Sequence, residues 1–536
     1  MGSELDNKDC DVLVVGAGAS GAAFTWRLAE AGIKVTCLEQ GGWLDPAVDY
    51  ATSDPDWEIH RQTDFNPNPN YRNLESDYPI NMDNTPISPL MYNSVGGSTI
   101  HWSAHFPRMK PSDFRVRSLD GVADDWPITY HDLEKYFSIN DQIMGVAGLN
   151  GDPGYPEKSP RQTPPIGLGK LGDTIASGFD KLGWHWWPSD SAINTVEYDG
   201  RQGCNNCGPC DLGCSIKAKA STDVTYWPKA IQMGARLVTN ARVREVTINN
   251  QGLADGVLYY DSDGLLQEQK AKIVVMACNG IGTPRILLNS KSPTFPEGLS
   301  NSSGLLGKNL MFHPYAGVTG RFEDDLEGHK GPSPLNIMCS EHYETDLNRG
   351  FVRGYSYQVT RSAAPVATAI GGKIPWGKNH HDEFKNRFNK TIRFAVIGED
   401  LPEPHNQVTL DPELTDGDGI PSPKISYTLS ENSRKMMDHG IKTSTEVMKA
   451  AGAVEVYTDP LLKEAGWHLL GTARMGTHSS NSVVDESGRS HDVRNLFIVD
   501  GSIFVTSGAV NPTSTILALA LYIADYVSKN SRHLLD

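Results

Sequence analysis

The sequence lacks an excess of basic residues and any long apolar run. Lysine and arginine number 48 against 65 aspartates and glutamates, which gives a formal net charge of −17 at pH 7. Nucleic acids and anionic membrane surfaces bind basic patches, so this balance argues against both as partners. Residues 516–524 form the longest apolar run near the C-terminus, with about half the length that crosses a bilayer. We therefore expect no nucleic-acid partner and no segment inserted in a membrane.

An export signal is also absent from the sequence. The N-terminal residues are acidic and polar and lead directly into the first apolar run, and there is no twin-arginine motif. A secretory signal instead combines a basic start, an apolar core and a cleavage site. By these signals we expect a cytoplasmic protein.

Cysteine is scarce, with eight residues in 536, too few for a disulfide scaffold. Four of them lie close together: Cys204, Cys207, Cys210 and Cys214. Their C-x2-C-x2-C-x3-C spacing is the ligand run of bacterial ferredoxins, although Ser215 stands where ferredoxins have proline. The spacing predicts one iron–sulfur cluster, 3Fe-4S or 4Fe-4S. A zinc ion held by four cysteines and cysteines without a metal are the alternative interpretations.

The stretch from residue 11 to 42 carries the clearest motif. A short β-branched apolar run leads into glycines in G-x-G-x-x-G spacing, then an amphipathic helix and a second strand that ends on an acid. Gly16 permits the tight turn, Gly18 lets the backbone approach a pyrophosphate, and Gly21 lets helix and strand pack closely. Glu39 stands where a carboxylate can accept ribose hydroxyls. The stretch predicts binding of an adenine dinucleotide, FAD or NAD.

The rest of the chain alternates between loop-rich and regular segments. We expect long loops over 50–90, a helix over 127–145, strands at 237–248 and 256–261, a buried strand followed by a helix over 271–288, and an apolar helix over 514–527. Between about 319 and 463 alternating strands such as 351–359 and 391–397 indicate a second domain on a largely antiparallel sheet.

Several motifs in a fixed order carry a family resemblance. They are VVGAGASGAAFTWRLAEAG with LEQGG, SVGGSTIHW, NGIGTPRILLNS, GKNLMFHP, EDLPEPHNQVTLDP, HLLGTARMG and LFIVDGSIFVTSGAVNPTSTILALAL. Over nearly its whole length the chain resembles the glucose-methanol-choline (GMC) flavoprotein oxidoreductases. Within them it is similar to the branch of FAD-dependent glucose, gluconate and glucoside dehydrogenases and pyranose oxidases.

The resemblance implies FAD as cofactor and a fold of α/β plus α+β character. A Rossmann-like FAD-binding domain would be discontinuous, and a substrate domain would stand on a mainly antiparallel sheet. The expected segments are 8–50, 90–110, 215–318 and 464–530 for the first domain, and 111–214 with 319–463 for the second, with the cysteine cluster at 204–214.

The resemblance also assigns cofactor contacts. Gly16, Gly18, Gly21 and Glu39 would hold the ADP half of FAD, Gly96, Gly97, Ser98 and Thr99 would lie along the flavin and ribityl chain, Val243 would touch adenine through its backbone, and Asp500, Gly501, Pro512 and Thr513 would close over the isoalloxazine. His101 falls where some relatives attach FAD covalently and others do not.

Alcohol oxidation needs a base for the hydroxyl proton while the flavin takes the hydride, and histidine is the natural base near neutral pH. By resemblance His468, in GWHLLGTARMG, is the base, and Asn511 orients the substrate hydroxyl. We interpret His313, in MFHP, as structural.

These features predict an FAD-dependent dehydrogenase of primary or secondary alcohols, with a sugar, glycoside or polyol as substrate and an electron acceptor other than NAD. A small subunit or a cytochrome is the expected partner, and relatives without a signal can be exported with a partner that has one. The alternatives are an oxidase that uses O₂, with a structural cysteine cluster, and a flavin-bound lyase of the hydroxynitrile-lyase type.

Overall fold

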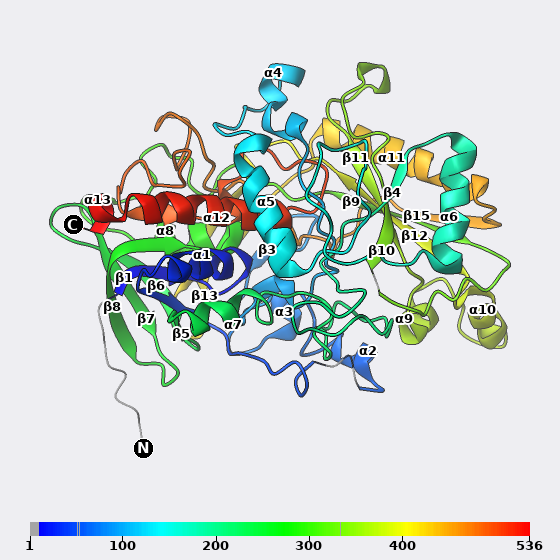
Figure 1. The fold of residues 1–536 in the computed structure, drawn as a ribbon, viewed down its shortest axis with the longest axis horizontal. Coiled ribbons are helices and arrows are strands. Elements are labelled where there is room, and N and C mark those ends of the chain that lie inside the picture. Colours follow the sequence, from blue (N-terminus) through cyan, green and yellow to red (C-terminus); the bar gives the residue numbers. More distant parts are fainter. Residues whose placement is uncertain (1–9, 51, 53, 333, 536) are drawn as a thin grey trace.

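The computed structural model describes residues 10–50, 52, 54–332 and 334–535. Residues 8 and 9, where the predicted FAD-binding domain begins, lie outside the described residues, as does the N-terminal segment used above to exclude an export signal. Figure 1 shows two sheets side by side, each with its own helices. The chain passes between them repeatedly, because strands of each sheet come from widely separated parts of the sequence.

A seven-stranded sheet forms the core of the first lobe. Parallel pairing joins β1 to β2 and β8, β2 to β5, and β8 to β16, whereas β6, β7 and β8 pair antiparallel. The strands are β5 (Arg236–Val238), β2 (Val35–Leu38), β1 (Cys10–Val15), β8 (Leu266–Met276), β7 (Ala254–Tyr260) and β6 (Arg242–Ile248) in this order, with β16 (Leu496–Ile498) beside β8. β1 is buried on both faces, which explains its continuous apolar sequence.

The turn between β1 and α1 (Ala19–Glu30) requires its glycines. Gly16 has a φ of +100°, in a region that side chains rarely adopt. A Cβ atom at Gly21 would lie 1.9 Å from the Gly16 carbonyl oxygen. The helix therefore packs on the strand more closely than any larger residue allows, as the motif predicts.

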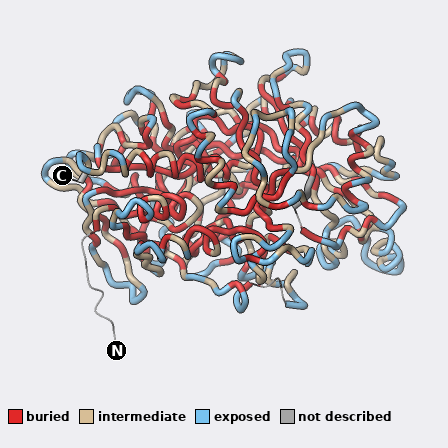
Figure 2. The backbone as a smooth tube through the Cα atoms, in the orientation of Figure 1, coloured by how far each residue is buried: buried red, intermediate tan, exposed pale blue. Residues whose placement is uncertain are grey.

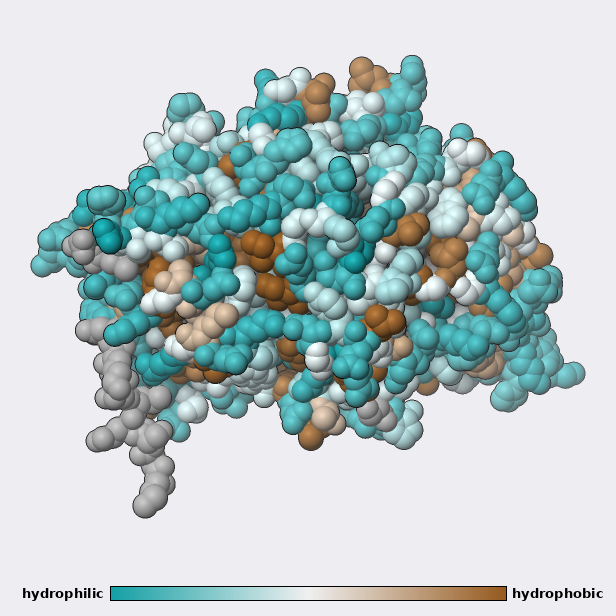
Figure 3. All heavy atoms as spheres, in the orientation of Figure 1, coloured by the Kyte–Doolittle hydropathy of each residue, from teal (hydrophilic) through white to brown (hydrophobic). Residues whose placement is uncertain are grey.

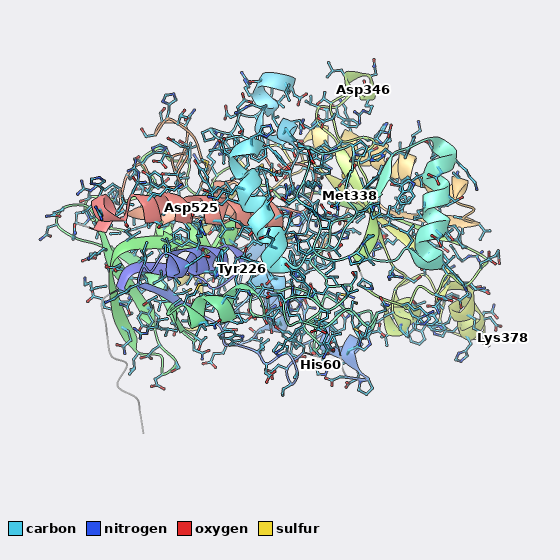
Figure 4. All side chains as sticks on the ribbon, viewed as in Figure 1. His60, Tyr226, Met338, Asp346, Lys378 and Asp525 are labelled. Atoms are coloured by element: carbon cyan, nitrogen blue, oxygen red, sulfur yellow. The ribbon has the colours of Figure 1, made fainter. Side chains whose placement is uncertain are left out.

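Two further helices pack in series on α1. α12 (Thr513–Lys529) contacts α1, and α5 (Tyr130–Met144) contacts α12. Asp525, labelled on α12 in Figure 4, joins all three, because its carboxylate accepts from Arg27 Nε at 2.6 Å and from the Tyr136 hydroxyl at 3.0 Å. Both helices confirm the expectation from sequence.

The second lobe is built on a six-stranded sheet that is antiparallel throughout. Its order is β15 (Glu455–Asp459), β9 (Tyr315–Arg321), β12 (Thr391–Gly398), β11 (Tyr355–Thr360), β10 (Pro334–Cys339) and β4 (Trp186–Pro188). Helices α6 (Gly169–Leu182) and α11 (Glu431–Ala450) bury their apolar sides in the same core as this sheet. The expected fold class, a Rossmann-like domain with a second domain on a mainly antiparallel sheet, is confirmed.

A third, small sheet supports the helix that follows β8. It consists of β13 (Gln407–Thr415), β14 (Pro421–Ser426) and β3 (Asn81–Asn84). Ile281 of α8 (Asn279–Asn289) shares an apolar cluster with Val408 and Ile425 of this sheet. The predicted domain boundaries remain a prediction.

Short helices complete the described part of the chain. They are α2 (Trp57–His60), α3 (Pro69–Arg72), α4 (Val116–Asp120), α7 (Tyr226–Gln232), α9 (Pro365–Ile370), α10 (His380–Arg387), α13 (Ser531–Leu535) and the 3₁₀ turns η2 (Gly97–Thr99), η3 (Pro111–Phe114), η4 (Leu347–Arg349) and η5 (Gly501–Ile503). Apart from α2, α3 and β3, the segment expected as loops over 50–90 is irregular where it is described.

Burial and surface character follow this arrangement. Figure 2 shows buried backbone continuing from one lobe into the other, and Figure 3 shows a mostly hydrophilic face with scattered apolar side chains. Among the described residues, no helix is both long enough and apolar enough to cross a membrane.

Candidate active site

One cavity of about 1060 Å³ runs between the two lobes. Its lining includes Gly16, Glu39 and Val243 as well as His468 and Asn511. The lining also includes residues of α2, the segment 361–367 and the loop 207–209, among which Cys207 and Val366 are exposed. Pockets for drug-sized ligands rarely exceed about 1000 Å³, so this cavity can hold a dinucleotide with space beside His468.

Glu39 lines the cavity beside the turn between β1 and α1. Its carboxylate accepts hydrogen bonds from the N–H groups of Ala17 at 2.8 Å and Gly41 at 2.9 Å. Burial raises the pKa of Glu39 to about 7, and these backbone donors oppose the rise. Each oxygen keeps a second lone pair, so the ionised group can still accept hydroxyls from a ligand.

Most of the predicted cofactor contacts surround this cavity. The lining includes Gly16, Gly18, Glu39, Gly97, Ser98, Thr99, His101, Val243, Asp500, Gly501, Pro512 and Thr513. Gly21 instead packs on the Gly16 carbonyl, and Gly96 faces the Asp223 side chain. Those two glycines allow close packing behind the lining, and their predicted contact with the cofactor stays a prediction.

Both carboxylate oxygens of Asp500 accept hydrogen bonds from within the protein. One carboxylate oxygen accepts from the Ser502 N–H at 2.9 Å and caps η5, and the other accepts from the Thr283 hydroxyl at 2.5 Å. Asp500 therefore joins η5 to α8 at the cavity wall. Its predicted role over the isoalloxazine ring stays a prediction.

His101 is buried beside Tyr92 and lines the cavity. Its Nδ1 lies 2.9 Å from the Asp211 carbonyl oxygen, which can only accept, so Nδ1 carries the proton. Nε2 then holds a lone pair, and it has no hydrogen-bond partner among the described residues. Burial lowers the pKa of His101 well below its ordinary value.

His468 lies in the same cavity and contacts a second histidine. Its Nδ1 is 2.8 Å from Nδ1 of His313, and the two rings are nearly perpendicular. Burial lowers the pKa of His468 well below 6.5. His468 is therefore neutral at pH 7, the form that a base requires. The sequence analysis interpreted His313 as structural and did not predict this contact, because nothing in the MFHP segment indicates it.

Asn511 lines the same cavity as His468 and is held by β11. The Gln358 side-chain N–H donates to Asn511 Oδ1, and both residues line the cavity. The loop before Asn511 is fixed in the same way, because the Ser356 hydroxyl donates to the Ala509 carbonyl at 2.6 Å. This leaves the Asn511 amide N–H groups as donors. No motif in the sequence indicated that Gln358 would hold Asn511.

The four clustered cysteines do not form a site for a single metal ion. Cys207 is exposed and lines the cavity, Cys210 is buried, and Cys204 and Cys214 are intermediate. Within the described residues, the one set of three metal-ligating atoms within 4.8 Å is Asp54, Asp56 and His60. A tetrahedral zinc site needs sulfurs about 3.8 Å apart, so the zinc interpretation is not supported. No disulfide joins any of the eight cysteines, all of which are described.

The first lobe has the fold of a dinucleotide-binding domain, and the cavity lies between it and the second lobe. Family comparison matches "GMC oxidoreductase" at residues 174–315 and 402–520, and an "NAD(P)-binding Rossmann-like domain" at residues 14–54. The chain belongs to the GMC oxidoreductase family. The resemblance read from its motifs is confirmed.

Relatives support this assignment over the whole length. A 2-methyl-1,2-propanediol dehydrogenase of Mycolicibacterium austroafricanum is 42% identical over 98% of this chain and 96% of its own. The fructose dehydrogenase large subunit of Gluconobacter japonicus is 31% identical over 96% and 97%. Among solved structures, a formate oxidase of Aspergillus oryzae studied for FAD modification superposes with a TM-score of 0.64 at 15% identity, covering 98% of this chain and 99% of that one.

Proposed function

We propose that this protein is an FAD-dependent dehydrogenase that oxidises a hydroxylated small molecule and passes the electrons to an acceptor other than NAD. The observation that carries the proposal is the single cavity in which the dinucleotide-binding turn, His468 and Asn511 all lie. The named substrates of the two relatives, a diol and a sugar, favour a polyol or a sugar here.

The cavity residues fit FAD. Gly18 carries no side chain into the space beside the α1 N-terminus, where an added Cβ would meet only Gly97 Cα at 4.0 Å, and Glu39 retains lone pairs for ribose hydroxyls. When bound, FAD supplies the acceptor for the hydride that leaves the alcohol carbon.

His468 and Asn511 would handle the substrate hydroxyl. The His468 lone pair would take the proton, so the O–H bond breaks as an N–H bond forms on the ring. Asn511 would donate an amide N–H to the same oxygen and hold it in line with the base, without competing for the proton.

We also propose one iron–sulfur cluster on the four cysteines. Three largely buried cations act electrostatically on the thiols: Lys219 on Cys210 and Cys214, Arg201 on Cys214, and Arg361 on Cys204 and Cys210. Positive charge favours the thiolate form that binds metal, but burial outweighs Arg361 and leaves the pKa of Cys204 raised. Burial raises the pKa of Cys207 to about 11, so metal binding would displace protons. A cluster separates its cysteines more widely than one zinc ion does.

Anaerobic mixing with candidate alcohols tests the proposal. 2-Methyl-1,2-propanediol, fructose and a simple monohydric alcohol should be compared, with loss of visible flavin absorbance as the readout. His468→Ala should reduce the rate of flavin reduction by roughly 10²–10⁴-fold, whereas His381→Ala, an exposed control on α10, should not change it.

The alternatives give different results in the same experiment. Flavin that stays oxidised with every alcohol would contradict the proposal and favour the lyase. Rapid reoxidation of the reduced flavin by O₂, with matching peroxide formation, would instead identify an oxidase. A His468→Ala rate within threefold of wild type would remove His468 as the base.

A further inference from the structure

The backbone places His313 and His468 directly opposite each other. Met311 and Leu470 exchange two backbone hydrogen bonds, of 3.0 and 3.1 Å, in antiparallel register. His313 lies two residues after Met311 and His468 lies two residues before Leu470, so in this antiparallel register their side chains emerge on the same side of the pairing. The ring centroids are 4.7 Å apart and the Nδ1 atoms 2.8 Å apart.

The partner of His313 determines where its proton sits. Its Nε2 lies 2.7 Å from the Gly508 carbonyl oxygen. A carbonyl can only accept, so Nε2 carries the proton. Burial lowers the pKa of His313 to about 4, and the ring is therefore neutral at pH 7. A neutral imidazole with its proton on Nε2 has a lone pair on Nδ1.

The contact between the two Nδ1 atoms then has one possible direction. His313 Nδ1 accepts, so His468 Nδ1 donates, and the proton of neutral His468 resides on Nδ1. His468 Nε2 is left with the lone pair, on a ring that lines the cavity. A wrong tautomer of a catalytic histidine can cost about 10⁴ in kcat in serine proteases, so the choice of tautomer matters for rate.

We propose that His313 is a positioning residue that holds His468 in the tautomer with a free Nε2 lone pair. His313 then accepts the Nδ1–H of the imidazolium that forms when His468 takes the substrate proton. That proton moves from the hydroxyl oxygen to His468 Nε2, and the proton on Nδ1 stays in place. This inference rests on the proposed function of His468.

The Gly508 contact links the base to the loop that carries Asn511. Gly508 lies three residues before Asn511, and that loop is tied to β11 through Ser356 and Gln358. One loop therefore sets both the proton position on His313 and the position of the amide. The relative placement of base and amide is fixed by His313 as well as by the loop.

Two amide variants separate the contacts of His313. His313→Gln places an amide near Nε2 and can keep the Gly508 contact, but it removes the acceptor for His468. His313→Asn places its oxygen near Nδ1 and keeps that acceptor. We expect His313→Gln to slow flavin reduction roughly 10- to 100-fold with KM little changed and an acid limb displaced to lower pH, and His313→Asn to restore most of the rate.

A spectrum of the protein provides a readout that does not depend on turnover. ¹⁵N signals of histidine-labelled wild type, with His468 identified by its loss in His468→Asn, should show a protonated Nδ1 and a bare Nε2. His313→Gln should show a mixture of tautomers. If His313→Gln does not fold, the wild-type spectrum and His313→Asn still decide the question.

The outcomes also separate this inference from the proposed function. A bare Nδ1 on His468, or a His313→Gln variant with wild-type rate and pH profile, would overturn the role of His313 even if His468→Ala is inactive. Full flavin reduction by His468→Ala would instead refute the proposed base.

Discussion

Arg353, at the base of the loop that carries Asn511, offers a sharp test of buried electrostatics. Its side chain is 1% exposed and pairs with Asp113 at 2.5 Å, Glu399 at 2.9 Å and Asp120 at 3.0 Å. The exposed Glu344 is a fourth partner at 3.7 Å, and the three buried carboxylates alone leave an excess of negative charge around one guanidinium. Burial accordingly raises the pKa of Glu399 to about 7, although Arg353 opposes the rise. One of these carboxyls therefore holds a proton near neutral pH.

Arg353→Met should destabilise the protein by about 3–5 kcal/mol at neutral to alkaline pH, the usual cost of removing one partner of a buried ion pair. The remaining carboxyls would then stay protonated in the folded protein but ionise on unfolding. Each such group lowers the free energy of unfolding by about 1.4 kcal/mol for every pH unit above its unfolded-state pKa. The cost of Arg353→Met should therefore shrink as the pH falls from about 8 toward about 5.

Urea unfolding followed by circular dichroism at both pH values measures this effect. Arg353→Met with Glu399→Gln should recover part of the loss, because one buried carboxylate is removed. Arg321→Met is the matched control, since Arg321 pairs with Glu455 at 3.2 Å near the surface and should lose at most about 1 kcal/mol. Equal losses for Arg353→Met and Arg321→Met at both pH values would refute the reasoning.

Three further predictions concern the site. Because the pKa of His468 is lowered well below 6.5, flavin reduction should stay on its plateau through pH 6 and fall only at lower pH, as stopped-flow rates will show; a midpoint near 6.5 would contradict this. Acid precipitation should release FAD into the supernatant. Flavin retained in the pellet of wild type, but not of His101→Ala, would instead show covalent attachment at His101 Nε2, which has no hydrogen-bond partner among the described residues. Metal analysis of protein prepared without oxygen should find three to four irons per chain; one zinc, or no metal, would exclude the cluster on Cys204, Cys207, Cys210 and Cys214.

The dinucleotide-binding turn could be predicted because its determinants are local. The apolar run of β1, the positive φ of Gly16 and the close packing at Gly21 lie within a dozen residues of one another. The same holds for the apolar sides of α5 and α12 and for the Thr129 cap directly before α5. The small sheet under α8 could not be predicted in this way, because β3 and β14 are paired across more than three hundred residues.

Glu399 shows where motif recognition stops. Glu399 begins the EDLPEPHNQVTLDP motif, which contributed to the family resemblance. The motif alone could not show that the Glu399 carboxylate pairs with Arg353 rather than facing a ligand. Arg353 and Asp113 are 240 residues apart, and only the folded chain brings them to one point. The role of such a residue depends on distant partners that carry no local pattern.

The site residues themselves depend on both lobes at once. His468 and Asn511 belong to the segments that flank β16 of the first sheet, but Asn511 is held by Gln358 of β11 in the second sheet. His313 stands two residues before β9 of that sheet and contacts the Gly508 carbonyl. The orientation of base and amide is thus set where the lobes meet. Substitutions of Gln358 or His313, where the lobes meet, should change the rate of flavin reduction through the orientation of the base and the amide. Substitutions around Glu39 should instead change the affinity for the cofactor alone.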